Sequence, residues 1–125
     1  MTDRSTTGRT IMTEVLGEEY VRRRDSRDNA FNAPVRAISQ DTCYGEVWSR
    51  PGLDRGTRSL LCLAMLTALN RSEELRMHLV GAVNNGCTAT QIQEALLMTS
   101  QYCGLPAALT SFRIAEEVLS ERGLI

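Results

Sequence analysis

The sequence predicts an all-α protein, folded as an antiparallel bundle of about six helices. No stretch alternates apolar and polar residues as a half-buried strand does, whereas apolar residues recur at helical spacing in successive segments. Short stretches of Gly, Pro, Asn and Ser separate these segments. The length of 125 residues fits a single domain over residues 1–125, of which we expect residues 1–12 to be a flexible segment.

The first two helices are expected before residue 49. A weakly amphipathic helix is expected over residues 13–24, and the polar residues 22–32 are expected to form a loop. Pro34 suits the first position of the second helix, because this position leaves its amide hydrogen unbonded and proline has none. The stretch Ser-Arg-Pro-Gly at 49–52 then ends this helix.

The third helix bears on the oligomeric state. Asp54 can cap it, and it runs to about Leu69. Its second half is apolar on every side, so we expect it to be buried all round. A small domain cannot easily cover such a helix alone, because it buries only a modest share of its surface. The pattern therefore favours a homo-oligomer whose subunits cover this helix together.

Capping signals define the last three helices. Ser72 is expected to cap the fourth helix, and Gly86 fits the left-handed position just after its end. Thr88 and Gln91 form a capping box for the fifth helix. The sixth helix follows a Gly-Leu-Pro break and runs to about residue 120.

Charge and cysteine spacing exclude several classes of protein. The formal net charge is −1, so no basic field favours nucleic acid or an anionic membrane. The N-terminal residues lack the apolar segment of a signal peptide, and no apolar run approaches the roughly 20 residues of a membrane span, so we expect a cytoplasmic protein. The 4 cysteines lie far apart without a C-x-x-C pattern, which predicts free thiols and no metal centre.

His78 is the only histidine and the first candidate for chemistry. It falls in the apolar stripe of the fourth expected helix, so one interpretation is a histidine satisfied within the core. The other interpretation is a proton donor or acceptor near neutral pH, the usual functional role of an imidazole. A metal site is not expected, because the chain has no second histidine.

Carboxylate, phenol and guanidinium groups complete the candidate site. Glu46 either pairs with an arginine one turn later or orients His78. Tyr102 either packs at the end of the fifth helix or lines a pocket. Arginines near these residues are either solvent-exposed or bind a carboxylated small molecule through their bidentate forks. The arginines in question are Arg50, Arg55, Arg58 and Arg76.

Three motifs together resemble one enzyme family. They are G-E-V-W-S-R-P-G-L at 45–53, H-L-V-G-A-V-N-N-G at 78–86 and Y-C-G-L-P-A-A at 102–108. With this spacing the sequence resembles the 4-carboxymuconolactone decarboxylases, densely over residues 45–120 and loosely over residues 14–44. The resemblance implies an alkylhydroperoxidase D-like helical fold, assembly into a hexamer or trimer, and no cofactor.

The resemblance also implies a reaction, for which the sequence offers candidate residues. The reaction is loss of CO₂ from 4-carboxymuconolactone, giving 3-oxoadipate enol-lactone during the breakdown of protocatechuate. For this reaction we expect His78 to protonate the ring carbon or donate to the carbonyl oxygen, Glu46 to fix the histidine tautomer and return its proton, and Tyr102 to assist as a donor. The expected substrate-binding residues are Arg50, Arg58, Arg76 and Trp48.

Some positions depart from the related proteins. Alkylhydroperoxidase D proteins carry C-x-x-C-x-x-x-H on the equivalent helix, but here the cysteine positions hold Arg71 and Glu74, so a dithiol peroxidase lacks its thiols. Those proteins also carry a glutamate on the preceding helix, at the position that Ser59 occupies here. Decarboxylases of this type often have an arginine pair where this chain has Met12-Thr13. They often have Ala-Trp where this chain has Cys43-Tyr44. The alternatives are a paralogue acting on a related lactone or acid, a thiol-dependent peroxidase or disulfide reductase, and a non-catalytic ligand-binding oligomer.

Overall fold

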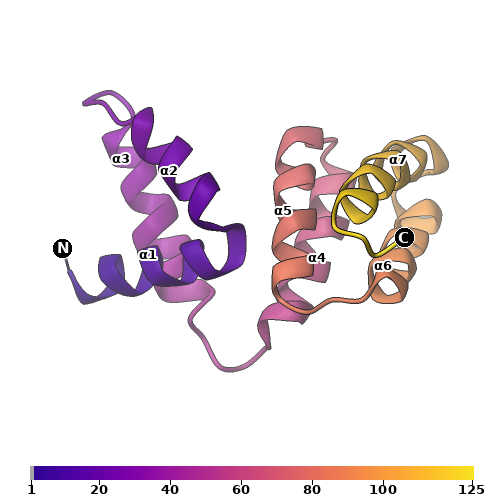
Figure 1. Ribbon diagram of the computed structural model, residues 1–125, viewed down its shortest axis with the longest axis horizontal. Coiled ribbons are helices and arrows are strands. Elements are labelled where there is room, and N and C mark those ends of the chain that lie inside the picture. Colours follow the sequence, from indigo (N-terminus) through magenta and orange to yellow (C-terminus); the bar gives the residue numbers. More distant parts are fainter. Residues whose placement is uncertain (1) are drawn as a thin grey trace. The chain divides into compact units, whose positions relative to one another are not determined.

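The computed structural model describes residues 2–125, and every regular element in them is a helix (Figure 1). The prediction of an all-α protein is confirmed. Among these residues, no helix has both the length and the apolar character that crossing a bilayer requires. The chain divides into two compact units, the first ending at Asp54 and the second spanning Arg55–Ile125. The expectation of a single domain over residues 1–125 stays a prediction.

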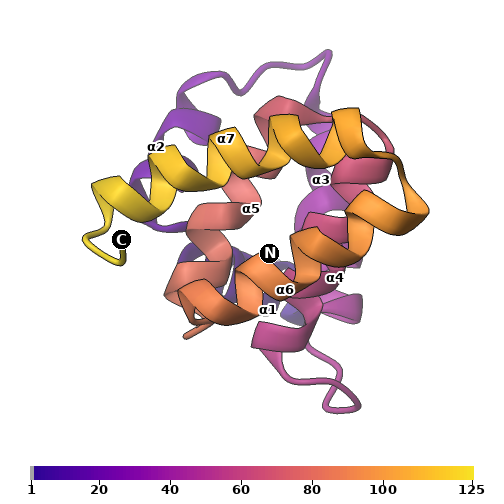
Figure 2. The ribbon, with the colours of Figure 1, turned by 90° about the vertical axis from the view of Figure 1, so that its right-hand side faces the viewer.

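Four helical segments make up each unit in the described part of the chain. The first unit contains α1 (Asp3–Leu16), α2 (Glu18–Ser26), α3 (Ala33–Ala37) and the π-helix η1 (Ile38–Val47). The second unit contains α4 (Arg55–Ala68), α5 (Ser72–Asn84), α6 (Ala89–Tyr102) and α7 (Leu105–Glu121). Figure 2 looks onto the second unit, where α6 and α7 form the layer nearest the viewer and α4 and α5 lie behind them.

Helix α1 packs against η1 at very short range. A Cβ atom on Gly8 would lie 1.7 Å from the carbonyl oxygen of Gln40. A Cβ atom on Gly45 would lie 2.3 Å from the carbonyl oxygen of Arg4. Only glycine permits such an approach of one backbone to another, so these two positions fix how α1 and η1 fit together.

An aspartate links three segments of the first unit. Asp25 of α2 accepts hydrogen bonds from two guanidinium nitrogens of Arg9 in α1, one of them at 3.3 Å. It also accepts one from Arg36 of α3 at 3.1 Å. The bonds from Arg9 are the main cause of the lowered pKa of Asp25, because they stabilise the ionised carboxylate.

Helix boundaries in the first unit differ from those expected. Residues 3–12, expected to be flexible, belong to α1, and the stretch 13–24 is divided between two helices. Gly17 separates them with a φ of 96°, a conformation that interrupts a helix and that glycine adopts readily. Helix α2 also continues to Ser26, into the stretch expected to be a loop.

The helix expected to begin at Pro34 forms, but most of it is not an α-helix. Helix α3 is short, and η1 continues it with hydrogen bonds from residue i to i+5. At its end, the amide of Trp48 donates to the carbonyl of Cys43 at 2.9 Å. Segments of this kind are rare and frequently occur at functional sites. This one carries Glu46.

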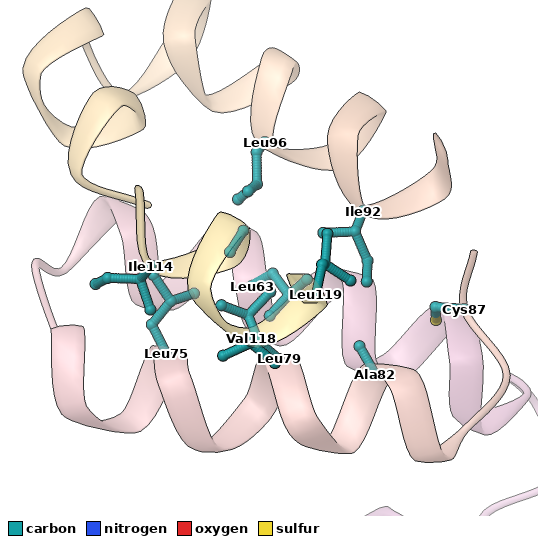
Figure 3. Packing of buried hydrophobic residues seen from close by; sticks show 11 residues of the cluster. Leu63, Leu75, Leu79, Ala82, Cys87, Ile92, Leu96, Ile114, Val118 and Leu119 are labelled. Atoms are coloured by element: carbon teal, nitrogen blue, oxygen red, sulfur yellow. The ribbon is translucent and has the colours of Figure 1, made fainter. Parts of the chain in front are cut away.

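A hydrophobic core holds the second unit together (Figure 3). Its buried members are Leu63, Leu75, Leu79, Ala82, Cys87, Ile92, Leu96, Ile114, Ala115, Val118 and Leu119. A polar contact crosses the same unit, where the hydroxyl groups of Thr67 and Ser111 hydrogen-bond at 2.8 Å and join α4 to α7. Each of the four helices therefore contributes one face to a shared interior.

Two capping predictions in the second unit are confirmed. Thr88 and Gln91 form the capping box of α6, and Gly86 follows α5 with a φ of 85°. The prediction that Ser72 caps α5 is wrong, because Ser72 is the first helical residue. Arg71 occupies the cap position without a side-chain hydrogen bond to the helix.

The expectation that the second half of α4 is buried all round is wrong for the single chain. Ser59, Leu63 and Thr67 are buried, whereas the side chains of Leu61 and Met65 are 47% and 55% exposed. Helices α5, α6 and α7 all pack against α4, and they cover one side of it. An apolar surface therefore remains on the other side.

Replacing Gly8 by alanine should destabilise the first unit strongly. The new methyl group would overlap a backbone oxygen of η1, which cannot rotate away as a side chain can, so we expect a loss of about 3 kcal/mol or more. Urea unfolding, monitored by circular dichroism and Trp48 fluorescence, measures the change in the free energy of unfolding. Gly52→Ala is the matched control, because nothing lies within 4 Å of a Cβ there. Equal stability of the two variants would contradict the close contact.

Candidate active site

His78 lies on α5 beside residues of the hydrophobic core. Leu75 and Leu79 are buried, and His78 is half-buried at the edge of the same side. Burial lowers the pKa of His78 from its ordinary value of 6.5, because desolvation disfavours the charged imidazolium. The negative charge of Glu74 opposes this effect. The neutral imidazole is therefore favoured at neutral pH.

Hydrogen bonds turn the His78 side of α5 toward α4. Asn85 follows His78 by seven positions, about two helical turns, and so lies on the same side of the helix. Its side-chain amide donates to the hydroxyl oxygen of Ser59 at 2.9 Å and to the backbone carbonyl of Arg55 at 3.4 Å. Because Ser59 is buried on α4, the surface that carries His78 adjoins α4.

The three arginines expected to bind substrate lie in different surroundings. Arg58 is half-buried on α4. Arg76 is exposed on α5 and forms an ion pair with Glu117 of α7. Arg50 is exposed in the loop after η1, in the first unit. Since exposed ion pairs contribute little stability, the pair of Arg76 and Glu117 can open at little cost.

Glu46 projects from η1 and forms an ion pair with Arg4 of α1. The hydrogen bond to Glu46 raises the pKa of Arg4, because it stabilises the charged guanidinium. Glu46 and His78 lie in different units, so the expected pairing of these two residues stays a prediction. Within its own unit, each already has a charged neighbour: Arg4 for Glu46 and Glu74 for His78.

The two aromatic candidates differ in exposure. The side chain of Trp48 is only 6% exposed and stacks on Tyr44, with ring centroids 5.5 Å apart and 20° between the ring planes. Tyr102 ends α6 and is 84% exposed. Trp48 therefore packs within the first unit, whereas Tyr102 does not pack at the helix end and presents its hydroxyl group to solvent.

The thiol groups do not share one environment. Cys43 and Cys103 are exposed, Cys62 is half-buried, and Cys87 is buried with its sulfur donating to the carbonyl of Gly56 at 3.4 Å. Within residues 2–125, no three side chains of His, Cys, Asp or Glu are placed to hold a metal ion together.

Three residues beside the candidate side chains had no role predicted from the sequence. Glu74 lies one helical turn before His78, and the i,i+4 spacing could have identified it. Asn85 contacts α4 across 26 residues, and Arg4 contacts η1 across 42 residues. No local pattern reveals contacts between residues so far apart in the chain.

Comparison with known proteins finds relatives along most of the chain. The model of the carboxymuconolactone decarboxylase family matches residues 34–117. A 4-carboxymuconolactone decarboxylase of Acinetobacter baylyi is 46% identical over 117 residues, which cover 94% of this chain and 87% of the relative. A nitrosuccinic acid decarboxylase of Metarhizium robertsii is 35% identical over 111 residues, covering 89% and 78%. An uncharacterized 15.0 kDa protein of Paracoccus denitrificans is 35% identical over 80 residues, covering 62% and 60%.

Proposed function

Because this chain belongs to the carboxymuconolactone decarboxylase family, we propose that it converts 4-carboxymuconolactone into 3-oxoadipate enol-lactone and CO₂. The observation that carries the proposal is 46% identity, over 94% of the chain, to a decarboxylase of that name. A second relative named as a decarboxylase supports carboxy-lyase chemistry. We also propose that the reaction is a step of protocatechuate breakdown and that the protein is cytoplasmic.

The reaction breaks the bond between a ring carbon and its carboxylate. CO₂ leaves, and the electron pair of that bond delocalises through the ring alkene to the lactone carbonyl oxygen. A proton then adds to the ring carbon beside the carbonyl. Because the lactone accepts the electrons itself, the chemistry needs no electron-accepting cofactor. The protein has to hold two carboxylates, stabilise the enolate-like oxygen and deliver the proton.

His78 is the proposed group for proton delivery. It is half-buried beside apolar residues, where a hydrogen bond to a developing charge is stronger than in water. As a neutral imidazole it can donate its N–H to the lactone oxygen, and as an imidazolium it can protonate the ring carbon. Donation to the oxygen and protonation of the carbon can both be performed by one imidazole at the edge of the core, and α5 places His78 there.

Two arginines of the second unit are the proposed carboxylate anchors. Arg58 is half-buried on α4, the helix against which the His78 side of α5 lies. Arg76 is exposed and would exchange Glu117 for a substrate carboxylate. A guanidinium group suits this role, because it binds a carboxylate through two parallel hydrogen bonds.

The remaining candidates keep their expected roles as part of the proposal. Glu46 would fix the tautomer of His78 and return its proton, and its ion pair with Arg4 is exposed. Tyr102, also exposed, would act as a hydrogen-bond donor. Arg50 and Trp48 keep their place among the proposed substrate-binding residues, Arg50 as an exposed guanidinium group and Trp48 as a buried ring.

Two departures from the family pattern bear on the choice of substrate. Met12 is buried in α1, and Tyr44 is buried against Trp48. These two side chains pack inside the first unit. The choice of 4-carboxymuconolactone over a related lactone or acid therefore rests on the identity to the decarboxylase of that name.

Apolar side chains exposed on the second unit support a homo-oligomer, which we propose to be a trimer or hexamer. They lie on three of its helices: Leu61 and Met65 on α4, Leu97 and Met98 on α6, and Leu105 and Leu109 on α7. Apolar surface of this kind commonly marks contacts between proteins. Sedimentation equilibrium measures the assembly, and a species of 13.9 kDa at micromolar concentration would exclude it.

Replacing His78 by alanine should lower kcat for the lactone at least about 100-fold, because a positioned acid–base group contributes about 10² to 10⁴ in rate. CO₂ release from pure, metal-free protein incubated with the lactone measures the effect. Circular dichroism establishes that the variant is folded. Decarboxylation at the wild-type rate would remove His78 from the mechanism.

Replacing Arg76 by alanine should mainly raise KM, because it removes a contact made with bound substrate before and during the reaction. Glu117→Gln is the matched control: it breaks the same ion pair but keeps the guanidinium group. We expect KM of this control to stay at or below the wild-type value. An equal rise of KM in both variants would show that the ion pair, rather than substrate binding, is what Arg76 provides.

A further inference from the structure

Glu74 and His78 leave α5 on the same side. They are four positions apart on an uninterrupted α-helix, where side chains at this spacing are neighbours. Glu73 lies five positions before His78 and points away from it. The two adjacent glutamates of the first turn of α5 therefore differ in direction while sharing charge, size and exposure.

The imidazole feels two opposing influences. Burial works against its protonated form, and the carboxylate of Glu74 favours it. The helices packed against α5 also carry charged or titratable side chains, of which Glu117 is held by Arg76. These side chains are Arg55, Arg58 and Cys62 on α4, and Arg113, Glu116, Glu117 and Glu121 on α7. Glu74 is a charge that acts on His78 in favour of the imidazolium.

We propose that Glu74 is a positioning residue for His78, accepting a hydrogen bond from one ring nitrogen so that the other nitrogen faces the substrate. The inference rests on the proposed function. A carboxylate one turn earlier on the same helix can set which nitrogen carries the proton and stabilise the imidazolium when it forms. It can do so without any contact between the two units, because both residues belong to α5.

Direct titration of His78 tests the pairing without reference to activity. The chain contains 1 histidine, so the NMR signal of an untagged protein follows this imidazole alone. In Glu74→Gln we expect the titration midpoint below that of the wild type, because burial then acts unopposed. Glu73→Gln, the matched control, should titrate like the wild type. Equal midpoints in the two variants would refute the pairing.

Kinetics test whether the pairing positions the imidazole for proton transfer. In Glu74→Gln we expect kcat to fall about tenfold or more with KM within about twofold of the wild type. The limb of the pH–rate profile that follows His78 should move to lower pH by the same amount as the NMR midpoint. Glu74→Asp should recover part of kcat, and Glu73→Gln should match the wild type.

The outcomes separate this inference from the proposed function. A wild-type kcat in Glu74→Gln overturns the positioning role, even where the NMR midpoint has moved. A wild-type protein that releases no CO₂ from the lactone refutes the proposed function. In that case a lower midpoint in Glu74→Gln alone still supports the pairing of the two residues, and equal midpoints refute it.

Discussion

The packing of one side of α5 into the core of the second unit determines what His78 can do. Leu75, Leu79 and Ala82 are committed to that core, so the neighbouring side of the helix is held at a fixed angle to it. Asn85 fixes the same side against Ser59 of α4. The imidazole is thereby kept at the boundary between the core and the surface, where burial weakens its charged form. A rotation of α5 that moved the imidazole would also break contacts in the core.

Local signals in the sequence predicted the parts of the fold that depend on local interactions. The all-α class, the capping box at Thr88 and the turn at Gly86 were recognisable because each depends on residues a few positions apart. The π-helix over residues 38–47 could not be recognised, because hydrogen bonding from residue i to i+5 has no sequence pattern of its own. The exposed side of α4 was not predicted, because the apolar composition of this helix does not show how much of its surface the other helices of one chain cover.

The candidate site shows the same division. His78 could be found as a lone histidine in an apolar stripe, and Arg58 as a basic residue near the start of the preceding helix. The partners of the other charged candidates could not be found, because Arg4 and Glu46, like Arg76 and Glu117, are more than 40 residues apart. Both ion pairs are exposed, so they contribute little stability and can open at little cost.

The stacked pair of Tyr44 and Trp48 has a practical consequence. The chain has 1 tryptophan and 1 histidine, and they belong to different units. Indole emission therefore reports on the packing of the N-terminal half, while the imidazole resonance reports on the C-terminal half. Each half carries its own natural spectroscopic label, and a single unlabelled sample can reveal whether the two halves melt as one cooperative block or in succession.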